Sequence, residues 1–83
     1  MLITDINHQI RSFLVASFLS GNAERLRDDE TLLGEVIDST GVLELVGFLQ
    51  ERFGITVDDE DVNQQNLASV NSLVSYVSRK MAA

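Results

Sequence analysis

Eighty-three residues without proline or cysteine, and with only five glycines, make one small domain (residues 1–83) in which helices are favoured over a turn-rich β fold. Because cysteine is absent, neither a disulfide framework nor a thiolate zinc site is available, and packing of a mostly aliphatic core must stabilise the fold. Thirteen acidic against six basic residues give a net charge of -7, which argues against nucleic acid and anionic membranes as partners and favours basic proteins.

The first predicted element is a helix at the start of the chain. Its apolar residues recur close to the 3.6-residue helical period, at Ile3, Ile6, Ile10, Phe13, Leu14 and Phe18. Thr4 or Asp5 is placed to cap its start, and Gly21 with Asn22 is placed to end it.

The segment that follows, residues 22–37, lacks a clean period. So long a connection in a small domain must pack itself onto the core. Five aliphatic side chains give it the means: Leu26, Leu32, Leu33, Val36 and Ile37. We also expect one short helical turn within the run DETLL, residues 29–33.

A second helix is predicted from Ser39, and it carries two stripes. One stripe is apolar and is assigned to the core: Val42, Leu45, Val46, Leu49 and Phe53. The neighbouring stripe mixes apolar residues with acids: Thr40, Leu43, Glu44, Gly47, Phe48 and Glu51. Gly54 is well placed to end this helix.

An acidic, irregular segment with a single turn over residues 59–62 leads to a last helix capped by Ser69. The apolar stripe of that helix consists of Val70, Leu73, Val74 and Val77. Arg79 and Lys80 lie near its C-terminus, where positive charge complements the helix dipole. The expected fold is therefore all-α: a small bundle of three main helices plus one short helix, with a long loop between the first two.

A hydrolytic triad is the first candidate chemistry. Asp5, His8 and Ser12 are spaced so that they share one side of the first helix. A single helix cannot surround its own surface with an oxyanion hole, and no nucleophile elbow is present. We interpret the three residues as a solvated polar face.

A calcium loop is the second. Asp59, Asp61 and Asn63 match its first three ligand positions, but Gln64 stands where glycine is needed and Val70 where the bidentate glutamate is needed. The geometry depends on both positions, so we reject the metal site and interpret the acidic run as solvated surface.

Asp38 and Ser39, within the run VIDSTGVLEL, stand at the start of the second helix. Either side chain can cap the helix, and from spacing alone a cap is the simplest explanation. The same place exposes a hydroxyl where an attached phosphate would meet unpaired N–H groups and the positive end of the dipole. Because no general base lies nearby in sequence, Ser39 is better suited to accept a group than to attack as a nucleophile in its own right.

The run DSTGVLELVGFLQERFGITVDDEDV, residues 38–62, resembles the acyl carrier protein family, which includes stand-alone peptidyl carriers. The family signature is Asp-Ser-Leu at the start of the second helix, followed by an acid-bearing amphipathic helix that ends in Phe-Gly-Ile. The likeness extends to DDETLL upstream and to LASVNSLVSYV downstream, so that it covers about residues 28–77.

The resemblance implies that Ser39 receives 4′-phosphopantetheine from coenzyme A, transferred by a separate Mg²⁺-dependent phosphopantetheinyl transferase that recognises Asp38. The thiol of this arm would hold an acyl or aminoacyl group as a thioester, and the protein itself would not be an enzyme. It also implies that the mixed stripe is the partner surface, with Leu43 as its apolar contact and with Glu44 and Glu51 pairing with basic patches on acyl-processing enzymes.

Several residues depart from the family pattern. Thr40 stands where leucine is usual, Gly41 at a commonly acidic position, Gly47 in place of a bulky apolar residue, and Gln50 at an often acidic one. The partner surface is therefore smaller and less charged, and we expect a specialised carrier loaded by an adenylate-forming acyl or amino acid ligase. Phe48, next to Gly47, would restrict where a cargo chain can lie.

The alternative hypothesis is an unmodified acidic module that docks basic partners through Leu43, Glu44, Phe48 and Glu51. Under either hypothesis we expect a monomer in the cytoplasm. The longest apolar runs are too short to span a bilayer, and Met1 is not followed by a signal-peptide pattern.

Overall fold

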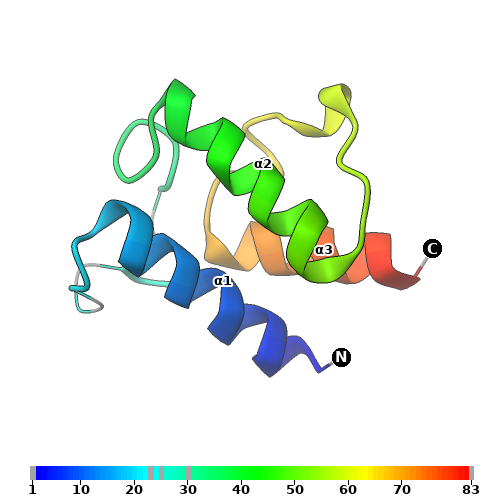
Figure 1. The fold of residues 1–83 in the computed structure, drawn as a ribbon, viewed down its shortest axis with the longest axis horizontal. Coiled ribbons are helices and arrows are strands. Elements are labelled where there is room, and N and C mark those ends of the chain that lie inside the picture. The colour runs from blue at the N-terminus through cyan, green and yellow to red at the C-terminus, as the bar shows by residue number, and fades with distance from the viewer. Residues whose placement is uncertain (1, 23, 25, 30, 83) are drawn as a thin grey trace.

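The computed structural model describes residues 2–22, 24, 26–29 and 31–82, and of Ile3 only the backbone. Along the described residues, α1 (Ile3–Phe18) is followed by α2 (Ser39–Phe53), the 3₁₀ helix η2 (Asp59–Asp61) and α3 (Val70–Ala82). The described residues include no strand, only an isolated bridge between Leu33 and Ile37. The all-α expectation, with a long loop between α1 and α2, is confirmed (Figure 1).

The start of α1 differs from the prediction. Leu2 is the N-cap residue, without a side-chain cap, and its carbonyl accepts hydrogen bonds from the N–H groups of Asp5 and Ile6 at 3.0 and 3.1 Å. Thr4 and Asp5 are thus already inside the first turn, so the predicted cap by either residue is wrong. Asp5 instead places its negative charge near the positive end of the helix dipole.

The end of α1 follows the prediction more closely. The N–H of Gly21 returns to the carbonyl of Val15 at 3.0 Å, which closes the helix. Gly21 has a φ of 83°, a left-handed conformation that glycine adopts without steric cost.

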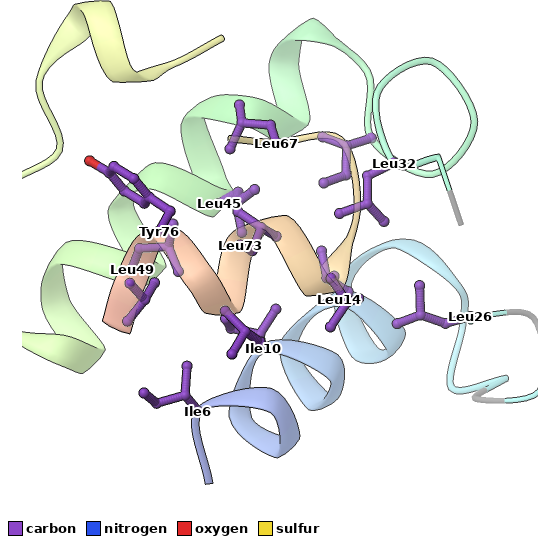
Figure 2. Packing of buried hydrophobic residues seen from close by; sticks show 14 of the residues in the cluster. Ile6, Ile10, Leu14, Leu26, Leu32, Leu45, Leu49, Leu67, Leu73 and Tyr76 are labelled. Carbon is purple, nitrogen blue, oxygen red and sulfur yellow. The ribbon is translucent and has the colours of Figure 1, made fainter. Parts of the chain in front are cut away.

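The core lies where α3 packs against both α1 and α2 (Figure 1). Figure 2 shows aliphatic side chains from all three helices meeting there, and the fully buried ones include Ile10, Leu14, Leu45, Leu49 and Leu73. The apolar stripe predicted for the last helix is entirely buried. In the stripe predicted for α2, Leu45, Leu49 and Phe53 are buried, whereas Val42 and Val46 are half-buried.

Aromatic rings fill the junction between α1 and α2. Phe13 of α1 stacks on Phe48 of α2 with ring centroids 4.2 Å apart and planes within 10° of parallel. Phe18 meets Phe13, and Phe53 meets Phe48, edge to face at 5.9 and 6.0 Å. Such pairs add to the free energy gained from area burial alone.

The first loop packs down as expected. Leu26, Leu32 and Ile37 are buried, while Leu33 and Val36 pack partly against the core. Two backbone hydrogen bonds tie the loop to the start of α3: Leu32 N–H donates to Ala68 O at 2.9 Å, and Asn71 N–H donates to Asp28 O at 3.0 Å.

A tight turn lies in this loop, later than the run DETLL in which we expected one. The N–H groups of Val36 and Ile37 both donate to the carbonyl of Leu32 at 2.8 Å, and Gly34 within the turn has a φ of 88°. Residues 29, 31, 32 and 33 are not helical, and Glu30 lies outside the described residues. The positive φ that glycine supplies fixes the turn at residues 32–37.

Candidate functional site

The site begins with the N-cap of α2. Asp38 has an extended backbone, and its Oδ1 accepts a hydrogen bond from the N–H of Gly41 at 2.7 Å. The Asp38 carbonyl accepts from Val42 N–H at 3.1 Å, the first bond of the helical ladder. Asp38 is therefore the cap, and the alternative that Ser39 caps the helix is excluded.

Ser39 is the first residue of α2, and its side chain is exposed. No group in the described part of the chain forms a hydrogen bond with its hydroxyl. The backbone N–H groups of a first helical turn lack intrahelical acceptors, and together with the helix dipole they favour a negative group. The hydroxyl is thus accessible at a place suited to a phosphate ester.

An open groove of about 580 Å³ adjoins Ser39, and most of its lining is apolar. One side is formed by the end of the first loop and the start of α2, including Ile37, Ser39 and Val42. Residues 62–64 and Leu67, in the segment between η2 and α3, form the opposite side. Ile37 and Leu67 are buried, so the floor of the groove is part of the core.

These features fit a 4′-phosphopantetheine group. The hydroxyl of Ser39 offers the attachment atom, and the first turn of α2 suits the phosphate. The apolar groove would accept the methyl groups of the pantoyl unit, and Asn63 and Gln64 at its edge offer polar partners for the amides. Asp38 Oδ1 already accepts the capping hydrogen bond from Gly41 N–H, and this bond does not involve the Ser39 hydroxyl.

The stripe predicted as the partner surface lies mostly in solvent. Leu43 is an exposed large hydrophobic residue, with 75% of its surface accessible. The side chains of Thr40, Glu44 and Glu51 are also exposed, as is Gly47. Phe48 differs because it is half-buried in the aromatic junction with α1, so only part of its ring is available to a partner.

Gly41 has a packing role that the sequence analysis missed. It is buried, and a Cβ added there would lie 2.7 Å from a ring carbon of Phe18 and 3.0 Å from a methyl carbon of Ile37. Its position is therefore set by the close approach of the α1 end to the α2 start, and its lack of charge says nothing about the partner surface. The buried positions of α2 recur every four residues, and Gly41 lies one turn before Leu45. This helical spacing was the signal from which the burial of Gly41 could have been predicted.

The acidic segment after α2 is more ordered than the interpretation as solvated surface allowed. Asp61 is half-buried, its Oδ2 accepts a hydrogen bond from the Tyr76 hydroxyl at 2.8 Å, and it lies 3.8 Å from Lys80 Nζ. That interpretation is wrong for Asp61. The pair is fifteen residues apart and joins a loop to α3, so no local pattern indicates it.

The other candidate chemistries gain no support from the structure. Asp5, His8 and Ser12 are all exposed on α1, and no hydrogen bond or ion pair between them is found in the described part of the chain. Within the residues that the structure describes, no group of three or more histidine, cysteine or acidic side chains is placed to hold a metal ion. No described helix is long and apolar enough to cross a membrane.

Comparisons with known proteins identify the class. The family model described as the phosphopantetheine attachment site matches residues 13–77. A probable acyl carrier protein of Serratia sp. strain ATCC 39006, PigG, is 32% identical over 79 residues, covering 93% of this chain and 84% of that protein. The D-alanyl carrier protein of Streptococcus suis strain 98HAH33 is 29% identical over 79 residues, covering 95% and 99%. The acyl carrier protein of Exiguobacterium sp. is 41% identical over 44 residues, covering 53% of each chain.

These matches define a carrier domain rather than an enzyme. The chain belongs to the phosphopantetheine-binding carrier family. Domains of this family carry covalently attached 4′-phosphopantetheine, and they interact with phosphopantetheinyl transferases and with biosynthetic enzymes.

Proposed function

We propose that this protein holds acyl or aminoacyl intermediates as thioesters on a 4′-phosphopantetheine arm attached to Ser39. The observation that carries the proposal is the exposed, unpaired Ser39 hydroxyl at the first turn of α2, beside an apolar groove. Asp38 performs the capping, which leaves the Ser39 hydroxyl available for modification.

The attachment reaction is a phosphoryl transfer. Ser39 Oγ forms a bond to the phosphorus that bears pantetheine, the bond from that phosphorus to the rest of coenzyme A breaks, and 3′,5′-adenosine bisphosphate leaves. The hydroxyl proton passes to a base of the transferase, because no described side chain of the carrier forms a hydrogen bond with the Ser39 hydroxyl. The thiol that the arm supplies then holds the acyl or aminoacyl unit as a thioester.

Asp38 serves two purposes in this proposal. Its carboxylate fixes the start of α2 through Gly41 N–H, so that Ser39 is always presented as the first residue of the helix. It is also the residue beside Ser39 that a phosphopantetheinyl transferase would recognise. Asp38→Asn keeps a capping side chain and removes the charge, and therefore separates these two purposes.

The test is modification followed by intact mass measurement. Apo protein incubated with coenzyme A, Mg²⁺ and a permissive phosphopantetheinyl transferase should gain the mass of one arm. Ser39→Ala should gain none, whereas Ser12→Ala, which removes an exposed serine of α1, should be modified as the wild type. No mass gain with several such transferases would contradict the proposal and favour the unmodified interaction module.

We further propose a specialised carrier, loaded by a dedicated adenylate-forming acyl or amino acid ligase. Two observations support this: the partner stripe has Thr40 where leucine is usual and Gly47 in place of a bulky apolar residue, and the relatives include a carrier named for D-alanine. Long-chain elongation on the modified protein by a reconstituted fatty-acid synthase would contradict it. Thioester formation with ATP and such a ligase, followed by intact mass, is the positive test.

A further inference from the structure

A polar cluster joins the acidic segment to α3. It consists of Asp61 in η2, Asp58 before it, and Tyr76 and Lys80 on α3. The Tyr76 hydroxyl donates to Asp61 Oδ2 at 2.8 Å, and Lys80 Nζ lies 3.6 Å from Asp58 Oδ2 and 3.8 Å from Asp61 Oδ2. Tyr76 is itself buried, so one end of this Asp61 cluster is anchored in the core (Figure 2).

The Asp61 cluster is followed directly by the segment of residues 62–67. The Asp61 carbonyl accepts a hydrogen bond from Asn66 Nδ2 at 2.9 Å, and the Oδ1 of Asn66 accepts from Arg79 of α3 at 3.3 Å. Leu67 is the only buried side chain of this segment, and Val62 packs partly against the core. The segment therefore depends on polar contacts for its position, because few apolar side chains fix it.

The same segment forms one side of the groove beside Ser39. Val62, Asn63, Gln64 and Leu67 face the loop end and the start of α2 across the groove. A displacement of residues 62–64 would widen or close the groove without touching Ser39. The groove wall and the attachment residue are thus held by different elements.

We propose that Tyr76 and Lys80, acting through Asp61, position residues 62–67 as a wall of the groove, and that the arm attached to Ser39 packs against this wall. The inference rests on the proposed function, since it assigns the groove to the arm of the same chain. Ser39 itself lines the groove, so an arm attached to Ser39 can reach the wall while it stays within the groove. Covalent attachment gives the arm a high effective concentration at the groove, which favours its packing there.

Asp61 is a positioning residue in this proposal. Replacing it affects the wall first and the arm only through the wall. Tyr76→Phe removes the donated hydrogen bond and keeps the buried ring, whereas Asp61→Asn removes the charge and keeps the size. Asp59→Asn is the matched control, because Asp59 belongs to the same η2 helix, is exposed, and is not part of the cluster.

Hydrogen exchange of the apo protein tests the first half. Asp61→Asn and Tyr76→Phe should raise amide exchange in residues 62–67 by about tenfold, as expected for loss of one charge-assisted hydrogen bond. In both variants, amide exchange in α1 should match the wild type. In Asp59→Asn, amide exchange in residues 62–67 should also match the wild type. Equal acceleration in α1, which means global destabilisation, would overturn the positioning role, and so would unchanged exchange in residues 62–67.

Modification of the wild type tests the second half. In the protein carrying the arm, exchange in residues 62–67 should slow relative to the apo form, and the slowing should be reduced in Asp61→Asn but not in Asp59→Asn. Unchanged exchange at this wall in the modified protein would overturn the assignment of the groove to the arm. If Ser39 were never modified, the proposed function would fail, while the apo measurement would still decide the role of Asp61.

Discussion

Gly41 and Gly47 are both glycines within α2, yet their surroundings differ. A Cβ at position 41 would lie 2.7 Å from the Phe18 ring and 3.0 Å from Ile37, whereas a Cβ at position 47 would meet no heavy atom within 4 Å. Ile37 is fully buried, so it cannot move away without disturbing the core. The two positions therefore separate helix propensity from packing.

We predict opposite effects for the two alanine variants. Gly47→Ala should raise the free energy of unfolding by up to about 1 kcal/mol, because alanine favours the helix and meets nothing. Gly41→Ala gains the same propensity but overpacks the junction at a typical cost of about 1–3 kcal/mol, so it should be destabilised overall. Urea denaturation followed by circular dichroism measures both. In a Phe18→Leu background, Gly41→Ala should lose less unfolding free energy. A Gly41→Ala variant more stable than the wild type would contradict the close approach of Phe18 to Gly41.

Tyr76 offers a titration with a single reporter, since the chain has one tyrosine and no tryptophan. Burial of the ring, and then the hydrogen bond to Asp61 and the nearby carboxylates, raise the pKa of Tyr76 from 10.0 to about 12. Phenolate absorbance should therefore titrate near pH 12 in the folded protein and near pH 10 in urea. In Asp61→Asn the pKa should fall only part of the way, because burial remains, and no fall would contradict the hydrogen bond.

The direction of the effect on stability follows from these values. The pKa of Tyr76 is higher in the folded state than in the unfolded chain, so the unfolded chain loses its proton first. The stability that Tyr76 contributes is complete below about pH 10 and is lost as the pH rises to about 12. Compared with Tyr76→Phe, the wild type should therefore lose more unfolding free energy over this interval, as measured by urea denaturation at each pH.

Residue positions whose role is local were predictable, and those with a tertiary role were not. Ser69 caps α3 by accepting a hydrogen bond from Ser72 N–H at 3.2 Å, and Gly54 ends α2 with a φ of 66°, both as the sequence indicates. The close approach of Phe18 to Gly41 and the Tyr76–Asp61 bond depend on how distant segments meet. Patterns within one helix contain no information about such meetings.

At the scale of the element, α2 has one buried face, and its other face, with the proposed partner stripe, is mostly exposed. Leu45 is fully buried on one face, so Leu45→Ala should lower the free energy of unfolding by about 2–5 kcal/mol. Val46 beside it is only half-buried, and Val46→Ala should cost less. Chemical denaturation measures both losses. An equal loss in the two variants would contradict the orientation of the helix.

Charge reversals on the exposed face of α2 should change reaction rates and leave the helical fold unchanged. Glu44 and Glu51 are exposed, and reversing their charges to lysine should leave helicity unchanged while slowing modification by the transferase or loading by the ligase. The matched control is Glu24→Lys, an exposed acid in the first loop, outside the partner stripe. Rates from intact mass at several times decide the prediction, and equal rates in all variants would count against this surface.

The helices were predictable from the sequence, whereas one helix start and one loop turn were not. The hydrophobic period located all three helices, because each buries one continuous stripe. It failed at the start of α1, where the ladder begins from the carbonyl of Leu2 without any capping side chain. It also misplaced the turn of the first loop, which a left-handed Gly34 fixes at residues 32–37.

At the scale of the whole molecule, the net charge of -7 is confined to a body of 33 × 26 × 20 Å. The Debye length is roughly 30 Å at 0.01 M salt and about 10 Å at 0.1 M. At the lower salt each acid therefore repels acids across the entire molecule, and at the higher salt only its near neighbours. The phosphodiester proposed at Ser39 would add further negative charge to the same body.

We therefore predict that added salt stabilises the fold at pH 7. The free energy of unfolding should rise between about 0.01 and 0.1 M sodium chloride, because relief of repulsion outweighs the weakening of exposed ion pairs such as Arg11–Asp28 and Arg27–Asp29. The double variant Glu44→Gln, Glu51→Gln removes two exposed negative charges and should show a smaller rise. Urea denaturation at each salt concentration measures the effect. Destabilisation by salt would mean that the ion pairs, and not the excess of acids, dominate the electrostatics of this carrier.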